Sequence, residues 1–130
     1  MKIFSADSHF NEPPEFYKDL YKKHGALVPH IQENATGSFW VVNNFKRPLG
    51  VMNQPGARLG KIKSNLSISD TKDIYDLNVR KKIVKKDGIS MELLFPSGAL
   101  LHLVPEKKVR LQCFTKLNDF LYELDGFYKG

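Results

Sequence analysis

The sequence contains little cysteine and no long apolar run, and both shortages narrow the class of protein. Cys113 is the only cysteine among 130 residues, so this chain can form neither an internal disulfide nor a cysteine-based zinc site. We therefore expect a reducing compartment, most simply the cytoplasm. No stretch approaches the ~18 apolar residues that a membrane-spanning helix needs, and the first residues lack the apolar centre of a secretory signal. No membrane partner is expected.

Positive charge is in excess, which permits an anionic partner without requiring one. The chain has 20 Lys and Arg against 14 Asp and Glu, a net charge of +6. Residues 80–86 hold the densest run, which is typical of the solvated face of a helix. Beside aromatic residues such as Trp40 and Phe45, a basic surface could instead bind nucleic acid. No known nucleic-acid-binding motif accompanies it, so a small basic nucleic-acid-binding or interaction module is kept as the alternative.

The order of predicted elements indicates an α/β chain of one domain. Residues 2–6 predict a short strand, and the nearly continuous apolar run at 89–95 is typical of a parallel strand buried on both faces. Helices are expected at about 15–24 and 70–86, and a last helix begins after Pro105. Helices that alternate with buried strands predict that 2–6 and 89–95 pair in parallel.

The region between the first two helices follows a different pattern. Aromatic and β-branched residues around an Asn-rich turn predict a β-hairpin insert at about 38–52. We expect this hairpin to lie outside the parallel sheet, with Trp40 in a small satellite cluster. Residues 53–68 are rich in Gly, Asn and Lys and predict an exposed loop.

Asp7 and His9 are the candidate metal ligands. Residues two apart in a strand project from the same face, so a carboxylate and an imidazole should converge at the end of the first strand. Oxygen and imidazole nitrogen together suit zinc, manganese or another first-row divalent ion. A hydrogen bond that ties the strand end to the next helix would use the same two residue types, and a lone Asp-x-His spacing does not separate the two interpretations.

The wider context of this pair resembles a known family. Ser5-Ala6-Asp7-Ser8-His9, followed by Glu12-Pro13-Pro14, is similar to the opening of the amidohydrolase-related (amidohydrolase 2) metal-dependent hydrolases, the group that includes the aminocarboxymuconate-semialdehyde decarboxylase relatives. The resemblance continues, in order along the chain, at Trp40-Val41-Val42, Arg47-Pro48-Leu49, Tyr75-Asp76, Arg80, Asp87-Gly88-Ile89, Glu92-Leu93-Leu94-Phe95-Pro96-Ser97 and Leu117-Asn118-Asp119-Phe120-Leu121.

The resemblance implies a (β/α)₈ barrel with a divalent metal, zinc or manganese, at the C-terminal mouth. It implies that Asp7 and His9 bind this metal, and that the reaction is a hydrolysis or a non-oxidative decarboxylation of a small carbon–nitrogen or carboxylate-bearing substrate. Such a barrel takes about 250 residues. Residues 1–130 would then form its N-terminal portion, about two βα units, as a fragment that is inactive alone and completed by a missing barrel half or by a homo-oligomer.

The remaining candidates have simpler interpretations. We expect His24 to end a helix and His30 to be an exposed loop residue, whereas His102 could face the barrel mouth. Cys113 belongs to the apolar stripe of the last helix and is expected in the core. No residue of this chain is assigned a catalytic role.

Overall fold

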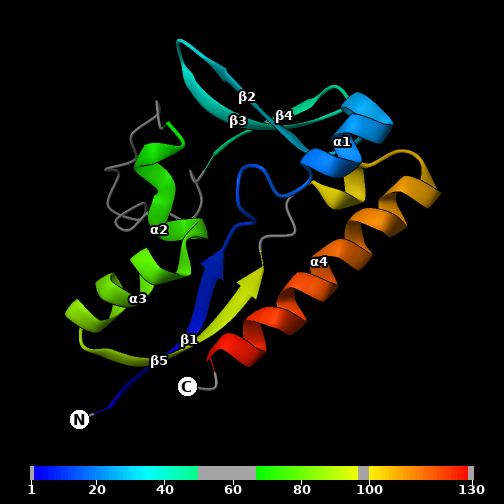
Figure 1. Ribbon diagram of the computed structural model, residues 1–130. Helices are drawn as coiled ribbons and strands as arrows, with labels where there is room; N and C mark the ends of the chain where they lie inside the picture. Colours follow the sequence, from blue (N-terminus) through cyan, green and yellow to red (C-terminus); the bar gives the residue numbers. More distant parts are fainter. Residues whose placement is uncertain (1, 50–66, 97–99, 129–130) are drawn as a thin grey trace.

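The protein has a mixed α/β fold with two separate sheets (Figure 1). The computed structural model describes residues 2–49, 67–96 and 100–128. In one sheet the two strands run parallel, as predicted, and in the other three strands run antiparallel. Within the described ranges neither sheet closes into a barrel. The parallel sheet consists of β1 (Ile3–Phe10) and β5 (Ile89–Pro96), and the antiparallel sheet of β2 (His30–Asn34), β3 (Gly37–Val42) and β4 (Phe45–Pro48).

Helices flank the parallel pair without covering it equally. In Figure 1, α2 and α3 lie next to β1, whereas the long α4 lies beyond β5 in this view and meets the pair at the end of β1, where Phe120 packs against Phe10. No helix in the described part of the chain is both long and apolar enough to cross a membrane. The helical segments are α1 (Lys18–His24), η1 (Gly25–Leu27), η4 (Ser69–Thr71), α2 (Lys72–Tyr75), α3 (Leu77–Lys86), η5 (Leu101–Leu103) and α4 (Lys107–Tyr128).

The single helix predicted for 70–86 is interrupted at Asp76, and this part of the prediction is wrong. Asp76 has an extended backbone, with φ −98° and ψ 104°, between α2 and α3. Its side chain accepts hydrogen bonds from the backbone N–H groups of Asn78 and Val79, at 3.0 and 3.2 Å. Because an N-cap satisfies donors that the first helical turn leaves free, Asp76 starts α3 as a new helix.

The parallel pair is covered on only one face, which corrects the expectation of burial on both. Glu92 and Leu94 alternate toward α3 and are half-buried, whereas Met91, Leu93 and Phe95 point the other way and are exposed. Met91 reaches 65% exposure. The apolar composition of residues 89–95 predicted that both faces of the strand are buried. Within the described residues, however, nothing covers the face with Met91, Leu93 and Phe95.

The hairpin is confirmed outside the parallel sheet, but its role in packing differs from the prediction. A third strand, β2, pairs with β3 in addition to the predicted β3–β4 hairpin. Trp40 is only 3% exposed and lies in the main hydrophobic core, so the satellite cluster is wrong. Its ring meets Tyr17 edge-on at 6.2 Å between centroids, which joins the antiparallel sheet to the chain that follows β1.

The core gathers between α4, the antiparallel sheet and the segments that lead into α1. The predicted apolar stripe of α4 is confirmed by Val109, Cys113 and Leu117, which are buried, and by Phe120, which packs against Phe10 of β1. Of the hairpin predicted at 38–52, the structure describes residues up to 49, and of the loop predicted at 53–68 only the last two residues lie within the described ranges.

Candidate functional site

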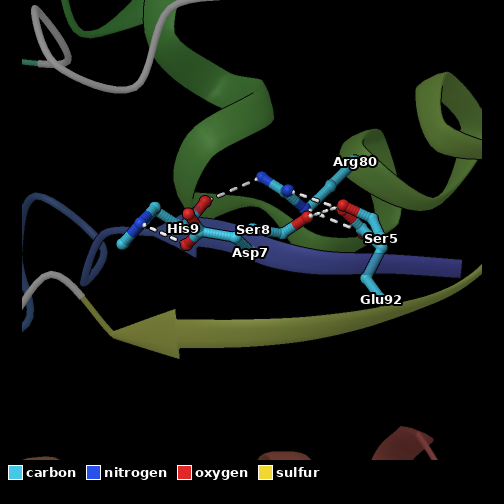
Figure 2. Close-up of polar contacts among 6 residues, drawn as sticks. All are labelled: Ser5, Asp7, Ser8, His9, Arg80 and Glu92. Atoms are coloured by element: carbon cyan, nitrogen blue, oxygen red, sulfur yellow. Dashed lines mark hydrogen bonds and ion pairs between the residues drawn. The ribbon is translucent and has the colours of Figure 1, made fainter.

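Asp7 and His9 converge at the C-terminal end of β1, as the sequence predicted. Asp7 Oδ1 lies 3.0 Å from His9 Nε2, and the two side chains are 77% and 50% exposed (Figure 2). The His9 ring also packs beside Phe95 of β5, at 5.9 Å between ring centroids. Both side chains therefore project from the open face of the parallel pair, at the edge where strands of α/β proteins carry their active sites.

An irregularity in β1 determines which face the pair occupies. Ser5 lies opposite Glu92 and Ser8 lies opposite Leu94, so β1 uses one more residue than β5 over this interval. Such a bulge reverses the alternation that follows it. As a result Ser5 and Ser8, three residues apart, both face α3, with 2.8 Å between their Oγ atoms, while Asp7 and His9 face the open side.

The two donors lie close to the spacing of adjacent ligands around a divalent ion. Zinc lies about 2.0–2.2 Å from nitrogen and oxygen ligands, and tetrahedral angles then place neighbouring ligand atoms about 3.3–3.6 Å apart. Asp7 Oδ1 and His9 Nε2 lie 3.0 Å apart, within direct hydrogen-bond distance, so the pair would separate by a few tenths of an ångström to hold zinc. In the described ranges no group of three or more His, Cys, Asp or Glu side chains is arranged to hold a metal. The pair thus fits part of a metal shell whose other ligands these residues do not supply.

A buried ion pair lies on the opposite face, directly behind the candidate ligands. Arg80 of α3 donates from Nε and Nη2 to the two carboxylate oxygens of Glu92 on β5, at 3.1 and 2.7 Å. Its Nη1 donates to the backbone carbonyl of His9 at 2.9 Å. Both side chains are largely buried, at 15% and 10% exposure. Arg80 therefore connects α3, β5 and the end of β1 through one guanidinium group (Figure 2).

Glu92 stays ionised in this position. Burial alone would raise the pKa of its carboxyl group, but the hydrogen bonds from Arg80 and Ser8 and the charge of Arg80 outweigh burial and hold the pKa below its usual range. The hydroxyls of Ser5 and Ser8 lie 2.8 Å apart, and either can donate to the other.

A second buried carboxylate, Glu12, was not assigned a role from the sequence. Glu12 is 2% exposed and accepts a hydrogen bond from the Tyr17 hydroxyl at 3.0 Å. Burial raises its pKa, while the bonds from its own backbone and from Tyr17 and the charge of Arg47 partly offset that effect. Burial and the neighbouring Glu12 also raise the pKa of Tyr17. The signal that could have found this pair is a charged residue directly before Pro13 at the end of a strand.

The other histidines lie in separate surroundings. His24 ends α1, as predicted, and its Nε2 lies 2.8 Å from Gln112 Oε1 of α4. His30 belongs to β2 rather than to an exposed loop, and its Nδ1 donates to the Val28 carbonyl at 2.9 Å. This bond and a ring contact with Tyr21 explain its half-buried position. His102 is exposed on η5 and joins no metal-binding group of described residues.

Neither Cys113 nor the groove beside α4 has the chemistry of an active site. Cys113 is fully buried, and burial raises the pKa of its thiol to about 11, so the thiolate that nucleophilic chemistry needs is disfavoured. A groove of about 610 Å³ lies between α1 and α4. Asp7 and His9 do not line it, and two of its charged residues, Asp19 and Lys116, pair with each other at 2.8 Å.

No protein-family model matches the chain, and no curated protein matches it either. The case for a function therefore depends on the geometry at the end of β1 and on the resemblance carried by the motifs.

Proposed function

We propose that this chain provides the N-terminal βα units of a metal-dependent hydrolase or non-oxidative decarboxylase of the amidohydrolase-related family. The observation that carries this proposal is the convergence of Asp7 and His9 at the C-terminal end of β1, beside the parallel strand β5. These two side chains would supply two ligands to zinc or manganese. The substrate class is a small molecule with a carbon–nitrogen bond or a carboxylate.

The distribution of polar and apolar residues on the parallel pair supports a barrel. In a (β/α)₈ barrel one face of every strand meets the surrounding helices and the other face fills the interior with apolar side chains. Here the face with Arg80 and Glu92 meets α3, and the opposite face presents Met91, Leu93 and Phe95. Further strands, from another part of the protein or from a second copy, would cover that face in the complete barrel.

The chemistry follows from the donor set. A divalent ion held at this point would act as a Lewis acid that activates water or orients a substrate carboxylate. Asp7 and His9 would hold and orient the ion, and Phe95 would limit the movement of the His9 ring by packing beside it. With two ligands the shell is incomplete, so this chain alone should bind zinc weakly and lack turnover.

Calorimetry with zinc on the full chain tests the proposed ligand pair. We expect weak binding by the wild-type chain and its loss in both Asp7→Asn and His9→Ala. The matched control is His102→Ala, which removes an exposed histidine from a different element and should leave binding unchanged. Binding that survives in His9→Ala would place the metal elsewhere, and no binding by the wild-type chain would contradict the assignment. Hydrolysis or decarboxylation by this chain alone would show that the site is complete.

A parallel measurement of oligonucleotide binding tests the alternative, a basic nucleic-acid-binding module. Lys81, Lys82, Lys85 and Lys86 are exposed on α3, but Trp40 is buried in the core and cannot stack on a base. Affinity for single-stranded oligonucleotides that falls steeply with salt would favour the alternative. We expect only weak, sequence-independent binding.

A further inference from the structure

The ladder between β1 and β5 is irregular next to the candidate ligands. Pairing passes from Ser5 opposite Glu92 to Ser8 opposite Leu94, which leaves Ala6 and Asp7 within the bulge. A bulged strand lacks regular pairing at that point, so contacts other than the ladder must help to fix the direction of the bulged residues. Asp7 lies in the irregular segment, and His9 follows Ser8, where regular pairing resumes.

The contacts that bridge this irregularity all lie on the face opposite the ligands. The guanidinium of Arg80 holds the His9 carbonyl on one side of the bulge and the Glu92 carboxylate on β5. The Ser8 hydroxyl also helps to lower the pKa of Glu92, and Ser8 is hydrogen-bonded to Ser5, which lies on the other side of the bulge. Together these contacts form a polar network on one face of the parallel pair, from Ser5 before the bulge to the His9 carbonyl after it (Figure 2).

We propose that Arg80 is a positioning residue for the Asp7–His9 pair, acting through the His9 carbonyl and the network that braces the β1 bulge. This inference depends on the proposed function, because a ligand pair needs a fixed direction only if it binds a metal. Arginine is suited to the role since its planar fork directs three bonds at once, whereas the ammonium of lysine has no fixed fork. Outer contacts of this kind typically change metal affinity 10–100-fold when they are removed.

Arg80→Lys tests the role while it keeps the positive charge beside Glu92. We expect the zinc affinity of the full chain, measured by calorimetry, to fall about 10-fold. The second measurement needs no metal: the nuclear Overhauser effect between the His9 and Phe95 rings, which lie 5.9 Å apart between centroids, should weaken in the variant. A residue with a purely structural role would lower the unfolding temperature and leave both of these quantities unchanged.

The control is Arg110→Lys on α4. Arg110 also donates to a backbone carbonyl, that of Val104 at 3.2 Å, but in a different part of the fold. The Arg110→Lys variant should change the unfolding temperature but leave the zinc affinity and the His9–Phe95 Overhauser signal as in the wild type. If Arg80→Lys fails to fold, Ser8→Ala, which removes one bond to Glu92, serves in its place with a smaller expected fall in affinity.

The two measurements separate this inference from the proposed function. The positioning role is overturned if folded Arg80→Lys keeps both the zinc affinity and the His9–Phe95 Overhauser signal of the wild type. The same holds for Ser8→Ala where that variant replaces Arg80→Lys. If the wild-type chain binds no zinc, the proposed function fails, and the ring signal alone decides whether Arg80 orients His9.

Discussion

Replacing Arg80 by methionine should destabilise the fold strongly at neutral pH. The substitution keeps most of the side-chain volume but removes both guanidinium donors to Glu92 and the donor to the His9 carbonyl. Glu92 would keep its charge at 10% exposure, with the Ser8 hydroxyl as its remaining bond in this network. Removing one partner of a buried ion pair typically costs 3–5 kcal/mol, because it leaves an uncompensated charge. We expect a loss of about 3 kcal/mol or more in the free energy of unfolding, measured by urea denaturation.

The size of this loss should depend on pH. Because the folded-state pKa of Glu92 lies below its unfolded value, its stabilising contribution is present above the unfolded pKa of about 4.3 and is lost as pH falls through the folded pKa. In Arg80→Met, burial without the guanidinium should instead raise that pKa, so protonation relieves the cost. The difference between wild type and variant should therefore narrow as the pH falls from 7 to about 4.

Two further variants make the reasoning refutable. Lys81→Met changes the exposed neighbour on the same helix and should alter stability by less than about 0.5 kcal/mol at either pH. Adding Glu92→Leu to Arg80→Met should recover much of the loss, because apolar residues often replace a buried pair at little cost. A loss below about 1 kcal/mol for Arg80→Met, or one that does not change with pH, would refute the account of a buried, charge-dependent pair.

Three other substitutions or probes test the fold. Tyr17→Phe should lower the free energy of unfolding by about 1–3 kcal/mol, because buried Glu12 loses a donor; an unchanged urea midpoint would contradict this. Asp76→Ala should lower it by about 1 kcal/mol through loss of the α3 N-cap, with reduced helix content in circular dichroism, whereas no change would mean that the cap is dispensable. Cys113 should react with an aromatic disulfide only as fast as the chain opens, because its thiol is fully buried and its pKa is raised to about 11; fast reaction in the native state would show an accessible thiol.

The elements that sequence predicted well are those with strong local signals. The parallel strands β1 and β5 and the apolar stripe of α4 follow from short apolar runs and helical spacing. The strand β2 was missed because Ile31 is its only apolar residue, and it forms by pairing with β3 rather than by its own preference. Strand formation that depends on a neighbouring strand leaves little trace in the local sequence.

The open face of the parallel pair shows a different limit. Met91, Leu93 and Phe95 predicted a buried strand because apolar side chains favour burial. Composition reports that preference and cannot say whether a covering element is present. The same residues are exposed in the described structure, which is why the strand was predicted correctly and its surroundings were not.

The candidate site shows how a local rule and a distant contact combine. Alternation predicted that Asp7 and His9 share a direction, and their side chains do meet at 3.0 Å, although Asp7 lies within the bulge and regular pairing resumes only at Ser8. The extra residue in β1 determines which face Asp7 and His9 share. The spacing of residues within the segment 5–9 does not predict this extra residue. A contact that holds this arrangement comes from Arg80, which lies 71 positions along the chain from His9 and begins a basic run that predicts a solvated helix face. One charged residue of such a run can therefore be buried while its neighbours stay exposed. The sequence feature that indicates a buried arginine here is its partner Glu92, an isolated acid within an apolar strand that needs a cation when it is buried.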